Sequence, residues 1–376
     1  MTNNKDKKVL NVPNLRFPEF TNEWGNITIK EACSEFQSGK NIKAEMITGQ
    51  GLYPVYGGNG LRGFTESYNH DGDYILIGRQ GALCGNIRKV TGKTYVTEHA
   101  IAVCASKENE TTFLQYLFQK MKLGQYSDQS AQPGLAVNKL LRLNINVPSK
   151  IEQAKIAKIL SLIDERIITQ NKIIEDLKKL KSAIIEIEYS PKDSYHSHIG
   201  GAIVQISKRN KDNHLCNVLS VSNRQGFIKQ SEQFEDRNVA SDDTSNYKIV
   251  EKNDFAYNPA RINVGSIARL TKFETGIVSP MYICFRTKDC LLPEYLELFF
   301  ESRNFFYHIQ KRLEGSVRLC LSYEELCNIP IVIPSIEKQK QVALHLSKLA
   351  QKIDLEMKIL QFVQQQKTYL LHQMFI

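Results

Sequence analysis

The sequence predicts an α+β protein in which a globular unit of mixed strand and helix, followed by a long helix, occurs twice. Part of the chain of 376 residues is repeated, because Val147-Pro148-Ser149 matches Ile333-Pro334-Ser335. The match continues without a gap to Lys181 and Lys367. The segments after the two serines contain neither Gly nor Pro, and their apolar residues recur at alternating spacings of three and four.

Each long helix is expected to begin at a Pro-Ser pair, because proline ends the preceding extended run and serine is a favourable N-cap. The apolar seams are Ile156, Leu160, Ile163, Ile167, Gln170, Ile174, Leu177, Lys181 and Ile184 in the first helix, and Val342, Leu346, Leu349, Ile353, Glu356, Leu360, Val363, Lys367 and Leu370 in the second. Seams of this heptad type predict a coiled coil. A duplication relates the two halves by a pseudo-twofold axis, so the helices are expected to pack antiparallel.

The globular units lie between these helices. The N-terminal tail and first unit are expected over 1–146, the first long helix over 147–190, the second unit over 191–332 and the second long helix over 333–376. Short apolar runs such as Tyr74-Ile75-Leu76-Ile77 and Ala100-Ile101-Ala102-Val103 stand among Gly- and Asn-rich turns. Each unit ends in an aromatic-rich segment that is expected to be helical.

Composition and charge indicate a soluble cytoplasmic protein. The 49 Lys and Arg exceed the 40 Asp and Glu, which gives a formal net charge of +9 and permits a polyanionic partner. No apolar run reaches the length of a membrane span, and the N-terminus lacks the apolar core of a signal peptide. The eight cysteines form no Cys-x-x-Cys and are expected to be reduced.

Templates for catalysis fail along the chain, so neither a catalytic residue nor a metal site is predicted. Gly92-Lys93-Thr94 has the end of a phosphate loop, but Ile87 occupies the position of the required first glycine. Asn258-Pro259-Ala260-Arg261 lacks the second proline and the aromatic residue of an amino-methyltransferase pocket. The histidines show no metal-ligand spacing.

Polar loops in both globular units carry the side chains that nucleic-acid binding requires. Arg and Lys neutralise phosphates and can grip guanine, while Asn and Gln pair with adenine. The candidate DNA-binding residues are Lys40, Lys43, Tyr56, Asn59, Arg62, Arg79, Gln80, Arg88 and Lys89 in the first unit, and Arg224, Gln225, Lys229, Asn258, Arg261, Asn263 and Arg269 in the second.

The layout resembles the specificity (S) subunit of a type I restriction-modification system. The residues that carry the resemblance are Pro13-Asn14-Leu15-Arg16-Phe17-Pro18 with Glu23-Trp24, the two Pro-Ser helix starts with the Gln153 and Gln339 that follow them, Gly78-Arg79-Gln80-Gly81, and Gln132-Pro133-Gly134-Leu135. The resemblance covers essentially the whole chain. One departure is Asp164, whose place in the second helix is taken by Ala350.

This resemblance implies that each globular unit is a target-recognition domain that reads half of a bipartite DNA site. It also implies that the antiparallel helices fix the gap between the half-sites and dock two methyltransferase (modification) subunits, and that restriction (translocase/nuclease) subunits join them. S-adenosylmethionine, ATP and magnesium are then expected on the partner subunits and none on this chain, which would be a non-catalytic part of a restriction enzyme and DNA adenine methyltransferase complex.

Two other classes remain open from the residues alone. An enzyme with cryptic motifs would need an Asn-Pro-Pro-Tyr or a Pro-Asp…Glu-x-Lys cluster, which the sequence lacks. A coiled-coil adaptor without DNA affinity would not need two loop-rich units that carry Gly, Arg and Asn. A salt-dependent DNA-binding titration distinguishes the adaptor from a specificity subunit.

Overall fold

The structure, a computed structural model, describes residues 10–127, 134–190, 197–223, 225–233, 243–315 and 319–376. The chain divides into two compact units: unit 1 is Met1–Asn171 with Lys358–Ile376, and unit 2 is Lys172–Met357. Each unit holds one globular part and a stretch of both long helices. The predicted α+β class with two long helices is confirmed.

Unit 1 is built around an antiparallel sheet in the order β2 (Cys33–Ser38), β8 (Ala100–Ala105), β5 (Asp73–Gly78) and β6 (Ile87–Thr91). A second sheet contains the hairpin of β3 (Tyr53–Gly57) and β4 (Gly60–Thr65), with β7 (Tyr95–Val96) parallel to β3. The strands β1 (Gly25–Thr28) and β9 (Asn144–Val147) pair antiparallel. The helices are α1 (Ile29–Ala32), η1 (Ala44–Met46), α2 (Thr111–Met121), η2 (Leu123–Tyr126) and α3 (Val137–Leu141).

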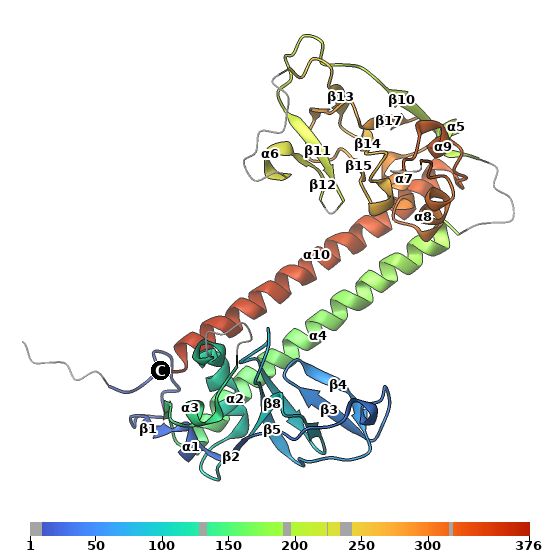
Figure 1. Cartoon of the computed structure of the whole chain (residues 1–376). Coiled ribbons are helices and arrows are strands. Elements are labelled where there is room, and N and C mark those ends of the chain that lie inside the picture. The colour runs from blue at the N-terminus through green and yellow to red at the C-terminus, as the bar shows by residue number, and fades with distance from the viewer. Residues whose placement is uncertain (1–9, 128–133, 191–196, 224, 234–242, 316–318) are drawn as a thin grey trace, which may run out of the picture. The chain divides into compact units, whose positions relative to one another are not determined.

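Strand β5 is covered on both faces, which explains its continuous apolar run. Its side chains alternate between the faces of the sheet. Ile75 and Ile77 are fully buried in one core with Phe113 of α2, whereas Leu76 is buried with Val96 of the second sheet. Figure 1 shows α2 beside the sheet that contains β5 and β8.

Unit 2 repeats this order of strands. Its main sheet is β10 (Ile203–Ile206), β17 (Ile283–Thr287), β14 (Phe255–Tyr257) and β15 (Ile267–Arg269), all antiparallel. The other sheet is β12 (Gly226–Lys229), β11 (Val218–Ser222), β16 (Thr275–Val278) and β13 (Lys248–Glu251), with β11 and β16 parallel. The helices are α5 (Ile199–Ala202), α6 (Gln230–Gln233), η3 (Ile262–Val264), α7 (Pro293–Phe299), α8 (Arg303–Gln310) and α9 (Tyr323–Cys327).

The central strand β14 repeats the alternation of β5. Phe255 and Tyr257 are buried in one core with residues of α7, and Ala256 is buried in another core with residues of β11 and β13. The first core residue of the strand is therefore Phe255 in unit 2 and Ile75 in unit 1.

The long helices α4 (Lys150–Glu188) and α10 (Ile336–Gln373) run antiparallel in each unit. In unit 1, Lys367 of α10 pairs with Asp164 of α4 at 2.6 Å, and Phe375 lies further along the chain, in the core that contains the start of α4. In unit 2, Lys338 at the start of α10 pairs with Glu188 at the end of α4 at 3.0 Å. None of the predicted seam residues is exposed.

The described part of the chain contains no helix that is both long and apolar enough to cross a membrane. Across the same residues, no group of three or more His, Cys, Asp or Glu side chains is arranged to hold a metal ion.

Candidate nucleic-acid interface

A tight loop between β5 and β6 in unit 1, Gly78–Asn86, carries two of the predicted residues, Arg79 and Gln80; we call it loop 1. The amide of Gly78 donates to the carbonyl of Asn86 at 2.9 Å and closes the loop. Gly85 has a φ of +84°, and a Cβ there would lie 2.1 Å from the Gly124 nitrogen. Only glycine accepts both the conformation and the close approach, so the path of the backbone at this position requires glycine.

Unit 2 builds the same loop between β14 and β15, Asn258–Ser266, which we call loop 2. The amide of Asn258 donates to the carbonyl of Ser266 at 3.0 Å, and Gly265 has a φ of +88°. A third element supports both loops: the amide of Leu135 donates to the carbonyl of Arg79 at 2.9 Å, and that of Leu321 to Pro259 at 3.1 Å.

The two loops share these bonds but not every backbone bond, because the Asn86 amide donates to Leu83 whereas the equivalent Ser266 amide donates to Arg261. They also present different side chains. Loop 1 exposes Gln80, Ala82, Leu83 and Asn86, whereas loop 2 exposes Arg261, Asn263 and Val264. Of the Gln132-Pro133-Gly134-Leu135 motif, only the last two residues are described, and Gly134 forms a β-bridge with Gln80.

The turn between β3 and β4, Gly57–Gly60, packs against loop 1. A Cβ on Gly58 would lie 2.7 Å from the carbonyl of His99 and 3.5 Å from that of Gln80. A Cβ on Gly60, where φ is +105°, would lie 3.2 Å from Nη2 of Arg88. Gly58 and Gly60 thus allow the turn to pack closely against loop 1 and against the guanidinium group of Arg88.

The structure therefore brings most of the unit 1 candidates together. Arg62 is an extra residue in a β-bulge of β4, and its side chain lies over Gly57. Asn59 is exposed on the turn, and His99 lies 3.0 Å from Oε1 of Gln80, which orients that amide. His99 was not among the predicted residues; only its place beside the loop identifies it.

The remaining unit 1 candidates lie at other places. Lys40 is exposed, and its amide donates to the carbonyl of Val96 at 3.0 Å. Lys43 is exposed at the N-cap of η1. Tyr56 is half-buried against the core beneath β3.

Lys89 and Arg269 occupy equivalent positions, and both contact the helix that covers the sheet. They pair across the strands with Ile75 and Phe255, the first core residues of β5 and β14. Nζ of Lys89 lies 3.0 Å from Asp73 and 3.0 Å from the Thr112 hydroxyl of α2.

Arg269 contacts Glu297 of α7 at 2.9 Å, Glu294 of the same helix and Asn253 at 3.0 Å. Side chains alternate along a strand, so Arg88 and its neighbour Lys89 point to opposite faces. The sheet is thus connected to the helix by a hydrogen bond of Lys89 in unit 1 and by ion pairs of Arg269 in unit 2.

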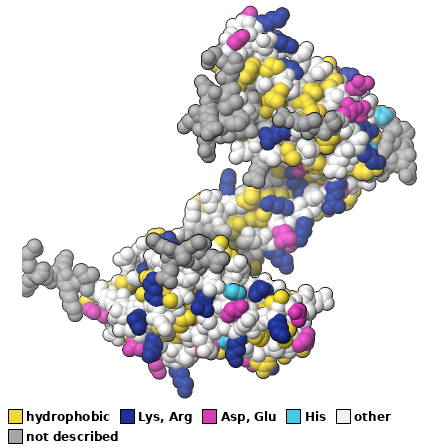
Figure 2. Space-filling view, viewed as in Figure 1, with side chains coloured by type: hydrophobic (Ala, Val, Ile, Leu, Met, Phe, Trp, Pro, Cys, Tyr) yellow, Lys and Arg dark blue, Asp and Glu magenta, His cyan; other side chains and the backbone are white. Residues whose placement is uncertain are grey.

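The guanidinium groups of Arg62, Arg79 and Arg88 differ from these paired cations. Among the described residues, no ion pair and no side-chain hydrogen bond holds them. Figure 2 shows lysines and arginines spread over the viewed face of both units and interspersed with acidic side chains. Within the described ranges, the absence of a partner therefore distinguishes the arginines beside loop 1 from Lys89 and Arg269.

In unit 2, too, some of the predicted DNA-binding residues are exposed on the loop, whereas others are held by contacts within the unit. Arg261 is exposed on loop 2 and lines a small cleft with Asn223, an exposed residue that the sequence did not single out. Asn258 is 8% exposed, and its side chain accepts the Ala260 amide at 3.1 Å, so it shapes the loop from within.

Of the candidates near the β11–β12 turn, Gln225 and Lys229 are exposed, and Arg224 lies outside the described residues. The carbonyl of Gln225 accepts a hydrogen bond from Lys272 at 3.2 Å.

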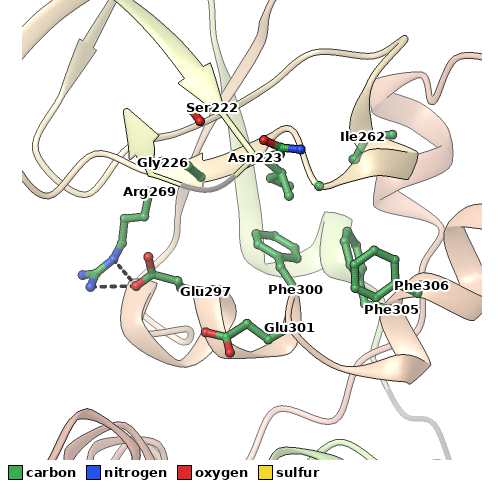
Figure 3. Close-up of a pocket in the computed structure, with 13 residues that line it drawn as sticks. Ser222, Asn223, Gly226, Ile262, Arg269, Glu297, Phe300, Glu301, Phe305 and Phe306 are labelled. Atoms are coloured by element: carbon green, nitrogen blue, oxygen red, sulfur yellow. Dashed lines mark hydrogen bonds and ion pairs between the residues drawn. The ribbon is translucent and has the colours of Figure 1, made fainter. Parts of the chain in front are cut away.

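A larger cleft of about 380 Å³ lies between loop 2 and α7–α8 (Figure 3). Phe300 and Phe306 line it together with the carboxylates of Glu297 and Glu301. Burial raises the pKa of Glu297 even though Arg269 lowers it. Carboxylates at this position repel phosphate, so the cleft is not part of the phosphate-binding surface.

Each globular part is fixed to its long helix by a buried glutamine one turn after the Pro-Ser pair. Gln153 accepts the Glu110 amide at 2.9 Å and donates to Asn109 and to the carbonyl of Pro148. Gln339 accepts the Leu292 amide at 2.8 Å. The sequence contained a signal for this role, because the internal repeat aligns Gln153 with Gln339.

Unit 1 has a further attachment at the start of α4. Glu152 is 1% exposed and binds Arg16 through both carboxylate oxygens, at 2.7 and 2.8 Å. The indole of Trp24 donates to the same carboxylate at 3.2 Å. The N-terminal segment that carried the family resemblance is thereby fixed to the helix.

Comparison with known proteins identifies the family. The family model for the type I restriction modification DNA specificity domain matches residues 21–179 and 227–365. The chain is 40% identical over 186 residues to the type I restriction enzyme EcoprrI specificity subunit of Escherichia coli, a match that covers 46% of this chain and 45% of that protein. The alignment thus spans less than half the length of this curated relative.

Solved structures share the fold. The type I restriction-modification S subunit from M. genitalium superposes with a TM-score of 0.66 and 17% identity, over 97% of this chain and 99% of that one. A chain from a solved type I restriction-modification system gives a TM-score of 0.53 with 13% identity, over 93% and 96%. The chain belongs to the family of type I restriction-modification DNA specificity (S) subunits.

Proposed function

We propose that this chain is the sequence-specific DNA-binding subunit of a type I restriction-modification complex. The domains within 1–146 and 191–332 each read one half of a bipartite site, and the helices within 147–190 and 333–376 set the spacing and dock methyltransferase subunits. The observation that carries the proposal is that loops 1 and 2 share their closing bond and their supporting contact while they expose different side chains. A constant scaffold with changed base-reading groups suits two domains that read different half-sites.

The side chains beside the loops divide by chemistry. Arg62 and Arg88, which lack partners among the described residues, suit phosphates or guanine. Gln80, oriented by His99, has the donor and acceptor that the adenine edge requires. On loop 2 the exposed Arg261 matches guanine in the same way.

The chain itself catalyses nothing in this proposal. Two copies of a methyltransferase (modification) subunit hold S-adenosylmethionine, and restriction subunits hold ATP and magnesium, in the cytoplasm where the DNA lies. The equivalent attachments of Gln153 and Gln339 support two copies, because they give each long helix a similar start. Similar surfaces invite two copies of one partner.

Charge reversal tests the DNA interface. Arg88→Glu and Arg261→Glu are expected to weaken DNA binding by about 1–3 kcal/mol each if the contact is to a base, and only for the affected half-site. A phosphate contact would instead weaken all sequences evenly and lower the salt slope by about one. Fluorescence anisotropy over a salt series distinguishes the two. Lys30→Glu, an exposed cation on α1, is the matched control; unchanged binding in both arginine variants would move the interface elsewhere.

Stoichiometry tests the partners. Mass measurement of the complex co-purified with a modification subunit is expected to give two such subunits per chain, and methylation only when that subunit is present. A fully active one-to-one complex, or methylation by the chain alone, would contradict the proposal.

A further inference from the structure

Leu83 is an exposed apolar side chain at the centre of loop 1. Its side chain is 44% exposed and belongs to none of the hydrophobic clusters of unit 1. Its backbone is nevertheless fixed, because its carbonyl accepts the Asn86 amide at 3.0 Å and lies 2.5 Å from where a Cβ on Gly78 would stand. Leu83 thus keeps 44% of its side chain exposed on a backbone that hydrogen bonds hold in place.

The duplication shows what this position can do. The bond from residue 84 to 81 in loop 1 recurs from 264 to 261 in loop 2, which places Leu83 opposite Asn263. Asn263 is exposed, and an exposed asparagine on a DNA-reading loop suits adenine. Leu83 therefore places an apolar side chain at the position where loop 2 carries a hydrogen-bonding one. The backbone bond from Asn86 to Leu83 belongs to loop 1 alone, and in loop 2 the exposed apolar residue is the next one along, Val264.

The surroundings of Leu83 favour DNA over a protein partner. Gln80 precedes it on the loop, and Arg79 and Arg88 flank the loop without an ion pair among the described residues. In the major groove the only apolar group on a base edge is the C5-methyl of thymine. Leu61 is also exposed, at 53%, beside Asn59 and Arg62 on the adjoining hairpin, so a second apolar side chain lies among polar reading groups.

We propose that Leu83 reads a thymine in the half-site of unit 1 by packing on its C5-methyl group. This rests on the proposed function, because it requires loop 1 to face the base edges. The equivalent position of loop 2, Asn263, then reads adenine. Specificity at this position would thus come from apolar contact in one half-site and from hydrogen bonding in the other.

The experiment uses the full chain with its modification subunit. Its preferred site is selected from random duplexes, and each thymine of the unit 1 half-site is then replaced by deoxyuridine, which removes only the methyl group. One replacement is expected to weaken wild-type binding roughly fourfold, the value of one buried methyl-sized group. Leu83→Ala should lose a similar factor on the thymine duplex and be insensitive to that replacement.

Two variants sharpen the test. Leu83→Asn, which copies loop 2, is expected to shift selection at that position from thymine to adenine. Leu52→Ala removes a more exposed leucine (70%) at the other end of β3, and it should behave as wild type.

The outcomes separate the inference from the function. If the wild type selects a bipartite site but no thymine replacement matters, or Leu83→Ala stays as sensitive as wild type, the inference is wrong and the function stands. If Leu83→Ala instead loses the modification subunit, Leu83 is a protein contact and the inference is also wrong. If the wild type selects no site, the proposed function is wrong, and the inference that rests on it is wrong as well.

Discussion

Replacing Gln339 by leucine should destabilise unit 2 by roughly 2–5 kcal/mol, because it removes three hydrogen bonds at nearly constant volume. Gln339 is 0% exposed. Its Oε1 accepts the Leu292 amide at 2.8 Å, and its Nε2 donates to the carbonyls of Cys290 at 3.0 Å and Pro334 at 2.8 Å. The side chain thus joins the start of α10 to the segment that leads into α7.

The size of this loss of stability follows from the three backbone groups that would lose their hydrogen bond to Gln339. The Leu292 amide would be an unsatisfied donor beside the fully buried side chain of residue 339, which costs about 1–3 kcal/mol. The two carbonyls belong to the exposed Cys290 and the half-buried Pro334 and can recover water, so each costs only about 0.5–1 kcal/mol. Leucine returns little of this, because glutamine already fills the space.

Urea unfolding followed by circular dichroism measures the loss, and amide exchange at Leu292 locates it. Gln341→Leu, an exposed glutamine on the same helix, is the matched control and should stay within about 0.5 kcal/mol of wild type. If both variants unfold at the same urea concentration, or if exchange at Leu292 is unchanged, the glutamine does not fix the helix to the globular part.

Three further predictions concern other parts of the chain. Glu152→Gln should cost about 3 kcal/mol in the same unfolding assay, because it leaves Arg16 without its buried carboxylate; a loss below 1 kcal/mol would contradict this. Burial raises the pKa of the Cys284 thiol to about 12, so iodoacetamide at pH 8 should label the exposed Cys216 and Cys290 and leave Cys284 unmodified by mass spectrometry. Rapid labelling of native Cys284 would show that the core opens. Removing one heptad from both long helices should shorten the tolerated gap between half-sites or abolish binding; full affinity for the original gap would exclude the helices as a spacer.

The sequence could predict the elements whose chemistry is local. Proline and serine mark the helix starts, and the recurrence of apolar residues marks the seams, so the α+β class and the long antiparallel helices were predicted correctly. The repeat also pairs Gln153 with Gln339, whose burial the structure explains.

The candidate site was harder to predict, because the type of a residue indicates its chemistry but not which way its side chain points. Arg88 and Lys89 are neighbours with the same charge, yet only Lys89 faces α2, and nothing in the sequence says which face of the sheet that helix covers. Asn258 has the side chain of a base reader but closes its own loop. The equivalence of the two loops could not be predicted either, because it rests on backbone hydrogen bonds between residues whose side chains differ from one loop to the other.

The departure in the repeat, Asp164 against Ala350, shows how the two halves diverged without leaving a charge unpaired. In unit 1, Lys367 pairs with Asp164 at 2.6 Å. The equivalent lysine in unit 2, Lys181, has no such aspartate and pairs with Glu301 at 2.6 Å. The same lysine of the helix repeat therefore finds its carboxylate on the facing long helix in one unit and just after α7 in the other.

This comparison predicts a rescue within unit 1. Asp164→Ala should cost about 2–3 kcal/mol in urea unfolding, because Asp164 also accepts the Tyr116 hydroxyl of α2 at 2.8 Å. The aromatic helices align so that Gln119 matches Glu301, and Gln119→Glu in the Asp164→Ala background should return about 0.5–1 kcal/mol by giving Lys367 the partner that Lys181 has. Gln119→Glu alone should gain less, since Lys367 is already paired, so the cycle of four proteins isolates the coupling. Equal effects of Gln119→Glu in both backgrounds would show that the lysine does not exchange partners.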